Sequence, residues 1–197
     1  MHRLSASFVL GYHGCDVDVA EALFAGKSFQ QSSNDYDWLG PGVYFWEANP
    51  QRGLDFAIEA SSRRGTSIKK PTVVGSIIDL GLCLDMTTLG AIEMVKVAYR
   101  SLKETMEKAG NELPRNGRDL LLRRLDCAVV RRLHSILAET NTSLDTVRGV
   151  FIEGEPIYPN AGFNEKTHTQ IAVRDLGCIK GVFRVPEDQL RRWSPPS

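Results

Sequence analysis

The sequence predicts an α+β fold, in which strand-forming segments at both ends of the chain enclose a helical block. Runs of β-branched and aromatic residues mark strands before residue 87 and after residue 146. From about residue 88 to 140, apolar residues instead recur at helical spacing. A chain of 197 residues is long enough for one domain that carries an insertion. We therefore expect a single domain over 1–197, with a helical insertion at about 88–140.

The first segments predict a strand, a helix and a loop. Residues 7–15 favour a strand that ends in a His-Gly step, and 17–25 have the apolar spacing of a helix. The polar stretch 27–37 is typical of a loop, and it is a candidate to fold over a ligand. The residues that favour the helix ends are Asp16 or Asp18 at its start and Gly26 after it.

A glycine-rich turn followed by an aromatic strand is the most distinctive stretch of the chain. The Gly-Pro-Gly turn at 40–42 has backbone freedom that other residues lack, and it leaves room for a ligand. Residues 43–46 then favour a short buried strand, with Tyr44 and Trp46 on one face. Tyr44, at the mouth of this turn, suits stacking on a flat ring. The alternative is that it is a core aromatic.

The rest of the chain predicts further helices and strands, joined by turn-rich connections. A helix begins at Asn49-Pro50, and the apolar residues expected on its inner side are Leu54, Phe56, Ala57 and Ile58. In the helical block, four arginines on one predicted helix could grip phosphates or an acidic partner, although interspersed carboxylates favour a solvated surface. The remaining predicted segments are strands 72–80 and 83–86, helices 92–106 and 120–137, strand 147–154, loop 155–166, strands 167–175 and 178–185, and a frayed tail 193–197. The arginines are Arg123, Arg124, Arg131 and Arg132.

Composition excludes several classes of function. The formal net charge is +0, so no overall field draws the chain to nucleic acid or membrane. The apolar runs are too short to span a bilayer, and the N-terminal stretch is too short for a secretory signal. We therefore expect a cytoplasmic protein without a membrane partner. The four cysteines form no CxxC pair, which favours free thiols over disulfides or a zinc site. We expect no bound metal, because the histidines are too scattered to serve as ligands.

Three short motifs carry a family resemblance through their order. They are His13-Gly14 at the end of the first strand, the G-x-G-V-Y-F stretch at 40–45, and the Q-I-A-V-R-D stretch at 170–175. In this order the chain resembles the ADP-ribosyltransferases of the diphtheria-toxin-like class, including the poly(ADP-ribose) polymerase catalytic domain. The similarity covers about 10–60 and, more loosely, 147–185, whereas 88–139 has no match. It implies a split β-sheet core with a helical insertion.

The resemblance also implies roles for individual residues, with NAD as the substrate. His13, Tyr44 and Gln170 would form the catalytic set. Loop 27–37 would cover the NAD donor, and loop 155–166 would recognise the acceptor. The NAD contacts implied by the family are a ribose hydroxyl at His13, the nicotinamide carboxamide at the Gly14 backbone, and the two faces of the nicotinamide ring at Tyr44 and Phe56.

Gln170 departs from the family pattern, which has a glutamate at this position. A glutamine can orient a ribose hydroxyl, but it has no charge to stabilise an oxocarbenium-like transition state. Loss of one well-placed electrostatic group costs about 3 kcal/mol. The missing carboxylate could come from nearby loop residues, or Gln170 could be a solvated strand residue with no role. The loop candidates are Glu153, Glu155 and Glu165.

These observations predict an NAD-dependent ADP-ribosyltransferase that modifies a protein or nucleic-acid acceptor and releases nicotinamide. A toxin or defence role is compatible with that activity. Three alternatives stay open: a module that binds NAD or ADP-ribose without turnover, an interaction protein that uses the 88–139 helices, and an NAD glycohydrolase with water as the acceptor. The sequence names neither the acceptor nor the oligomeric state.

Overall fold

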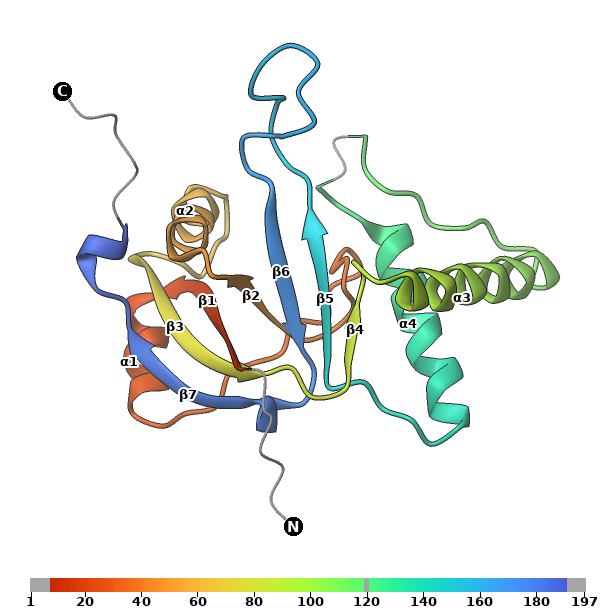
Figure 1. Ribbon diagram of the computed structural model, residues 1–197, viewed down its shortest axis with the longest axis horizontal. Helices are drawn as coiled ribbons and strands as arrows, with labels where there is room; N and C mark the ends of the chain where they lie inside the picture. Colours follow the sequence, from red (N-terminus) through yellow and green to blue (C-terminus); the bar gives the residue numbers. More distant parts are fainter. Residues whose placement is uncertain (1–7, 119–120, 191–197) are drawn as a thin grey trace. The chain divides into compact units, whose positions relative to one another are not determined.

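The structure is a computed structural model that describes residues 8–118 and 121–190. Within these ranges the chain forms seven β-strands and four α-helices, which confirms the predicted α+β class (Figure 1). It divides into two compact units, which we describe separately. Unit 1 includes the described residues of 8–29, 44–80 and 176–190, and unit 2 includes those of 30–43 and 81–175. Leu120 and the predicted tail 193–197 lie outside the described residues.

Unit 1 is built on antiparallel strand pairs. The strand β1 (Phe8–Asp16) pairs on one side with β2 (Val43–Glu47), where Tyr12 faces Trp46, and on the other side with β3 (Pro71–Asp79). The strand β7 (Ile179–Arg184) continues this order beyond β3 (Figure 1). The predicted strands 43–46, 72–80 and 178–185 are therefore confirmed, as is the strand predicted over 7–15 in its described part, with β3 at an interior position of the unit.

The two helices of unit 1 begin at side-chain caps that the sequence indicated. The helix α1 (Val17–Phe24) is capped by Asp16, whose carboxylate accepts a hydrogen bond from the Asp18 amide. The helix α2 (Pro50–Ser61) is capped by Asn49, whose side chain accepts from the Arg52 amide at 3.0 Å. Both predicted helix starts are confirmed, because each polar cap satisfies an amide that has no partner within the helix.

The inner face of α2 differs from the prediction. Ile58, which was expected to face inward, is 46% exposed. Ala57 is buried as predicted, and the other buried positions are Arg52, Gly53 and Ala60, so that three of the four have small side chains or none. Small residues are needed here because β1 and α2 approach each other closely, a constraint that apolar spacing alone does not reveal.

Unit 2 combines a mixed set of strands with a pair of helices. The strand β5 (Thr146–Phe151) pairs in parallel with β4 (Cys83–Asp85) and antiparallel with β6 (His168–Val173). Val147, Ile171 and Val173 are fully buried in its core. The predicted strand 147–154 was too long, since the ladder ends at Phe151 and residues 152–167 form a long loop.

The helices α3 (Leu89–Lys108) and α4 (Arg124–Glu139) pack against each other and fall within the predicted block 88–140. The helix predicted from residue 120 begins later, at Arg124. Its start is fixed by Asn116, whose side-chain oxygen accepts from the amides of Leu125 and Asp126 at 2.9 and 3.3 Å. A cap supplied from eight residues upstream of the first helical turn has no local sequence signature. No helix in the described ranges combines the length and hydropathy of a transmembrane segment.

Candidate functional site

His13, near the end of β1 in unit 1, has a defined orientation. Its Nδ1 lies 2.9 Å from the backbone carbonyl oxygen of Tyr44 on β2. A carbonyl oxygen only accepts hydrogen bonds, so Nδ1 carries the proton and donates it. In the neutral imidazole, Nε2 is then left with a lone pair. His13 therefore presents an acceptor that suits a hydroxyl donor.

The surroundings of His13 favour its neutral form. Its ring lies 5.5 Å from the Phe29 ring and 5.7 Å from the Phe45 ring, centroid to centroid. Burial lowers the pKa of His13 below 6.5, and the hydrogen bond with Tyr44 opposes this only in part. The imidazole is thus uncharged near neutral pH, which keeps the Nε2 lone pair available.

Gly14, predicted to contact nicotinamide through its backbone, has a packing role as well. A Cβ built on Gly14 would collide with the carbonyl oxygen of Gly53 in α2. Gly53 is also buried, and its own Cβ would lie 3.1 Å from a methyl group of Val73. The His-Gly step therefore allows β1 to approach α2, whatever ligand role Gly14 has.

Tyr44 and Phe56 have different neighbours in unit 1. Tyr44 is half-buried in β2, and its carbonyl holds His13. Phe56 packs its ring 4.8 Å from that of Trp46, the residue that follows Tyr44 on the same face of β2. The predicted contact of Phe56 with a nicotinamide ring stays a prediction.

Gln170 belongs to unit 2, where it lies in β6 and is only 9% exposed. Its Oε1 accepts a hydrogen bond from the indole Nε1 of Trp38 at 2.6 Å. The alternative that Gln170 is a solvated strand residue is therefore wrong, because its carbonyl oxygen is buried and engaged. A buried amide that accepts from a half-buried indole has at least a structural role.

Trp38 reaches Gln170 because the neighbouring strand has a glycine there. Gly149 in β5 is the register partner of Gln170, and a Cβ on Gly149 would lie 2.7 Å from the Trp38 ring. The indole therefore lies over the backbone of β5 at this position. Trp38 was not among the predicted site residues. The available signal was Gly149 itself, since a glycine inside a strand often marks a close approach.

Arg123 completes an aromatic cluster around Trp38. Its guanidinium carbon lies 5.2 Å from the centre of the Trp38 ring and 4.2 Å from that of Phe151. The Phe151 ring in turn stacks on His168 at 5.5 Å. The Arg123 side chain is only 16% exposed and pairs with Asp126 at 3.7 Å, while burial lowers its pKa. The prediction of a solvated arginine surface is therefore wrong for Arg123.

The other arginines of α4 bind their own chain. Arg124 forms an ion pair with Asp35 at 2.8 Å, and Arg131 donates to the carbonyl of Ser33 at 2.7 Å. Arg132 donates to the Ser101 hydroxyl of α3. The segment around 33–35, which belongs to the predicted donor loop, is thus tied to α4. The guanidinium groups that were expected to be available for phosphates or an acidic partner therefore bind groups of this chain.

The Gly-Pro-Gly turn also packs against protein atoms within unit 2. Gly40 has a positive φ of 80°, as the turn prediction requires. A Cβ on Gly42 would lie 2.8 Å from the Val173 carbonyl oxygen, so at Gly42 the space was left for the chain itself. The expectation that Gly42 leaves room for a ligand is therefore wrong on the side where its Cβ would point, because the Val173 carbonyl occupies that space.

The candidate carboxylates lie in or beside the loop that joins β5 and β6. Glu153 is half-buried and lies 3.9 Å from the Lys166 ammonium, whereas Glu155 and Glu165 are exposed.

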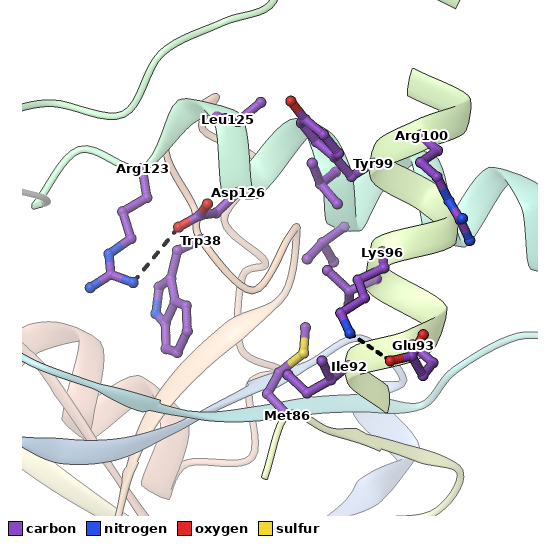
Figure 2. A pocket seen from close by; sticks show the side chains of 13 residues that line it. Trp38, Met86, Ile92, Glu93, Lys96, Tyr99, Arg100, Arg123, Leu125 and Asp126 are labelled. Carbon is purple, nitrogen blue, oxygen red and sulfur yellow. Dashed lines mark hydrogen bonds and ion pairs between the residues drawn. The ribbon is translucent and has the colours of Figure 1, made fainter. Parts of the chain in front are cut away.

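Unit 2 also contains a cavity of about 590 Å³ that is lined by residues of α3 and α4, with Trp38 in its wall (Figure 2). In the described residues, no three His, Cys, Asp or Glu side chains gather as a metal site would require.

The fold and these contacts define an α+β protein with a neutral, oriented histidine in unit 1 and a tryptophan-bound glutamine in unit 2. Comparison with family models, with curated proteins and with solved structures found no match to this chain.

Proposed function

We propose that this protein binds NAD and transfers ADP-ribose from it to a macromolecular acceptor, with nicotinamide as the leaving group. The observation that carries the proposal is the hydrogen bond from His13 Nδ1 to the Tyr44 carbonyl. It joins the first two motifs of the resemblance across neighbouring strands, and it leaves Nε2 as an acceptor for a ribose hydroxyl.

The chemistry assigns a role to each residue. The bond between the ribose C1′ and the nicotinamide nitrogen breaks, and nicotinamide leaves with the electron pair. The acceptor nucleophile forms the new bond to C1′ and loses its proton. Tyr44 would stack on the departing ring with a contribution of about 1 kcal/mol. His13 would fix the ribose, and the Gly14 backbone would bind the carboxamide.

A second function, NAD or ADP-ribose binding without turnover, is favoured by the state of Gln170. Its Oε1 already accepts from Trp38, and its amide has no charge to stabilise an oxocarbenium-like transition state. Transfer by this chain is therefore expected to be slow compared with an enzyme that has a carboxylate at this position. Hydrolysis, with water as the acceptor, would show the same dependence on Gln170.

Two measurements on one sample distinguish these functions. Calorimetry with NAD reports binding, and chromatography of a long incubation reports nicotinamide, with and without a cell lysate as the source of acceptors. Label from adenine-labelled NAD that becomes attached to macromolecules indicates transfer, and free ADP-ribose indicates hydrolysis. Binding without nicotinamide release supports the binding module.

The variant His13→Leu, whose side chain can accept no hydrogen bond, tests whether any binding uses the proposed residues. We expect it to weaken NAD binding by about fivefold, because one hydrogen bond to a ribose hydroxyl is worth about 1 kcal/mol. His134→Leu, in unit 2, is the matched control and should bind NAD as the wild type does. Absence of NAD binding in the wild-type protein would reject both functions.

A further inference from the structure

The cavity in unit 2 is lined by residues of a pair of packed helices, and no function has been assigned to it above (Figure 2). It has a volume of about 590 Å³ and lies between α3 and α4, with Trp38 and Met86 also in its wall. Pockets that hold small molecules have volumes of about 300–1,000 Å³. The cavity is therefore the size of a small-molecule site.

The walls are largely apolar and are held in place by contacts of their own. Trp38 is fixed by its hydrogen bond to Gln170 and by the Arg123 side chain. Val129 and Val130 are 5% and 2% exposed, so this side of α4 is anchored in the core. Walls that are already ordered lose little entropy when a ligand binds. An apolar ligand would also remove the exposed parts of Ile92 and Tyr99 from water, both 38% exposed.

The charged residues at the cavity have an excess of one cation. The lining includes three cationic side chains, Lys96, Arg100 and Arg123, and two carboxylates, Glu93 and Asp126. Lys96 lies 2.6 Å from Glu93, but their side chains are 61% and 66% exposed, and such exposed ion pairs contribute at most about 1 kcal/mol. The Lys96 ammonium has three donors and one carboxylate partner in this pair, so it can accommodate a second acidic group.

We propose that this cavity binds one small amphipathic anion, whose hydrophobic body packs between α3 and α4 and whose acidic group lies near Lys96 and Arg100. This site goes beyond the NAD-dependent function and does not depend on it. The apolar walls call for a hydrocarbon or aromatic body, and the positive excess selects an acid over an amine.

Anilinonaphthalene sulfonate, an aromatic anion, and decanoate, an aliphatic one, are suitable probes. We expect the fluorescence of the first to rise with one-to-one stoichiometry and decanoate to displace it. Val95→Trp places a large ring in the cavity wall and should weaken both probes at least tenfold. Val97→Trp is the matched control, since Val97 is on the same helix but 47% exposed and outside the wall. Ile92→Trp is a second cavity-filling variant, at a partly exposed position that tolerates a larger side chain.

Thermal melting checks that each variant is folded. Equal binding of both probes by the wild type, Val95→Trp and Ile92→Trp would overturn the proposal, as would the absence of any binding to the wild type.

The preference for a negatively charged ligand is tested with two matched compounds, the neutral decanol and the cationic decyltrimethylammonium. We expect decanoate to bind about threefold to tenfold more tightly than decanol, and the ammonium compound to bind most weakly. Lys96→Gln should remove the preference. Decanol that binds as tightly as decanoate would reject the acid as the ligand class.

Discussion

The indole nitrogen of Trp38 donates to the side-chain oxygen of Gln170 at 2.6 Å, beside the point where Gly149 of β5 faces Gln170 of β6. This contact joins residues 132 positions apart and fixes one of the proposed catalytic residues. It also orders the wall of the cavity between α3 and α4, because the same indole lines that cavity. The first of the following predictions tests this hydrogen bond, and the second tests the catalytic role proposed for Gln170.

Trp38→Phe is expected to reduce the free energy of unfolding by about 1–2 kcal/mol. It removes the indole donor and leaves the buried Gln170 oxygen without this partner. Chemical denaturation of the single variants Trp38→Phe and Gln170→Leu and of the double variant gives the coupling energy. We expect about 1 kcal/mol of coupling. Strictly additive losses would mean that the hydrogen bond contributes nothing to stability.

Gln170→Glu is expected to raise the rate of nicotinamide release by about a hundredfold or more, if the chain acts on NAD as proposed. A carboxylate can still accept from Trp38, and it adds the negative charge that an oxocarbenium-like transition state requires. The rate of nicotinamide release at saturating NAD is the measurement, and Gln170→Leu is the control of similar volume. Equal rates for the glutamate and leucine variants would remove Gln170 from the catalytic role.

Gly14→Ala is expected to destabilise the protein by about 3 kcal/mol. The added methyl group would collide with the Gly53 carbonyl, a backbone atom that cannot move without displacing α2. Gly181→Ala is the matched control, since it is also a strand glycine but has no atom within 4 Å of the added Cβ. The two midpoints of thermal unfolding should differ clearly, and equal midpoints would contradict the close packing of β1 on α2.

Asp16→Asn is expected to flatten the loss of stability in acid. The amides of Lys70, Asp18 and Lys69 hydrogen-bond the Asp16 carboxylate and hold its pKa below the ordinary value. A lowered folded-state pKa gives stability that is present above about pH 4 and is lost as pH falls through the folded-state pKa. Denaturation midpoints measured from pH 6 to pH 2 test this, with the exposed Asp18→Asn as the control. An unchanged pH profile would mean that these hydrogen bonds do not favour the charged carboxylate.

His134→Leu is expected to stabilise the protein most at low pH. Both ring nitrogens of His134 are buried without a hydrogen-bond partner in the described part of the chain, and burial lowers its pKa to about 4, helped by the Arg174 charge. The unfolded chain therefore takes up this proton first, so the wild type loses stability as pH falls from about 6.5 to 4. The loss is on the order of 2 kcal/mol. Denaturation curves at pH 7 and pH 4 measure it, and an identical loss in His134→Leu would contradict the assignment.

Local patterns were sufficient to predict most elements and several of their ends. Asp16 and Asn49 cap α1 and α2 as expected, because a cap satisfies amides within its own first turn. The same logic failed for α4, whose cap comes from Asn116, and for the inner face of α2, where Gly53 packs against β1. In both cases the partner comes from outside the helix.

The candidate site divides in the same way. Residue type and motif order were sufficient to propose His13, Tyr44 and Gln170 as site residues. The structure adds that burial lowers the pKa of His13 and so favours its neutral form. The Trp38 contact with Gln170 did not follow, since it depends on the glycine of β5 beside the indole ring. The burial of Arg123 did not follow either, since it depends on two aromatic rings that are distant along the chain.

The sequence alone determined the α+β class, the order of strands and helices, and the chemical groups available for binding. It could do so because periodicity and capping act between residues that are near neighbours along the chain. Only the tertiary structure decided that the Gly42 turn packs on Val173, that the α4 arginines hold residues 33–35, and that α3 and α4 together line a cavity. These contacts depend on strand register and on the path of the loops, which bring together residues that no local pattern connects.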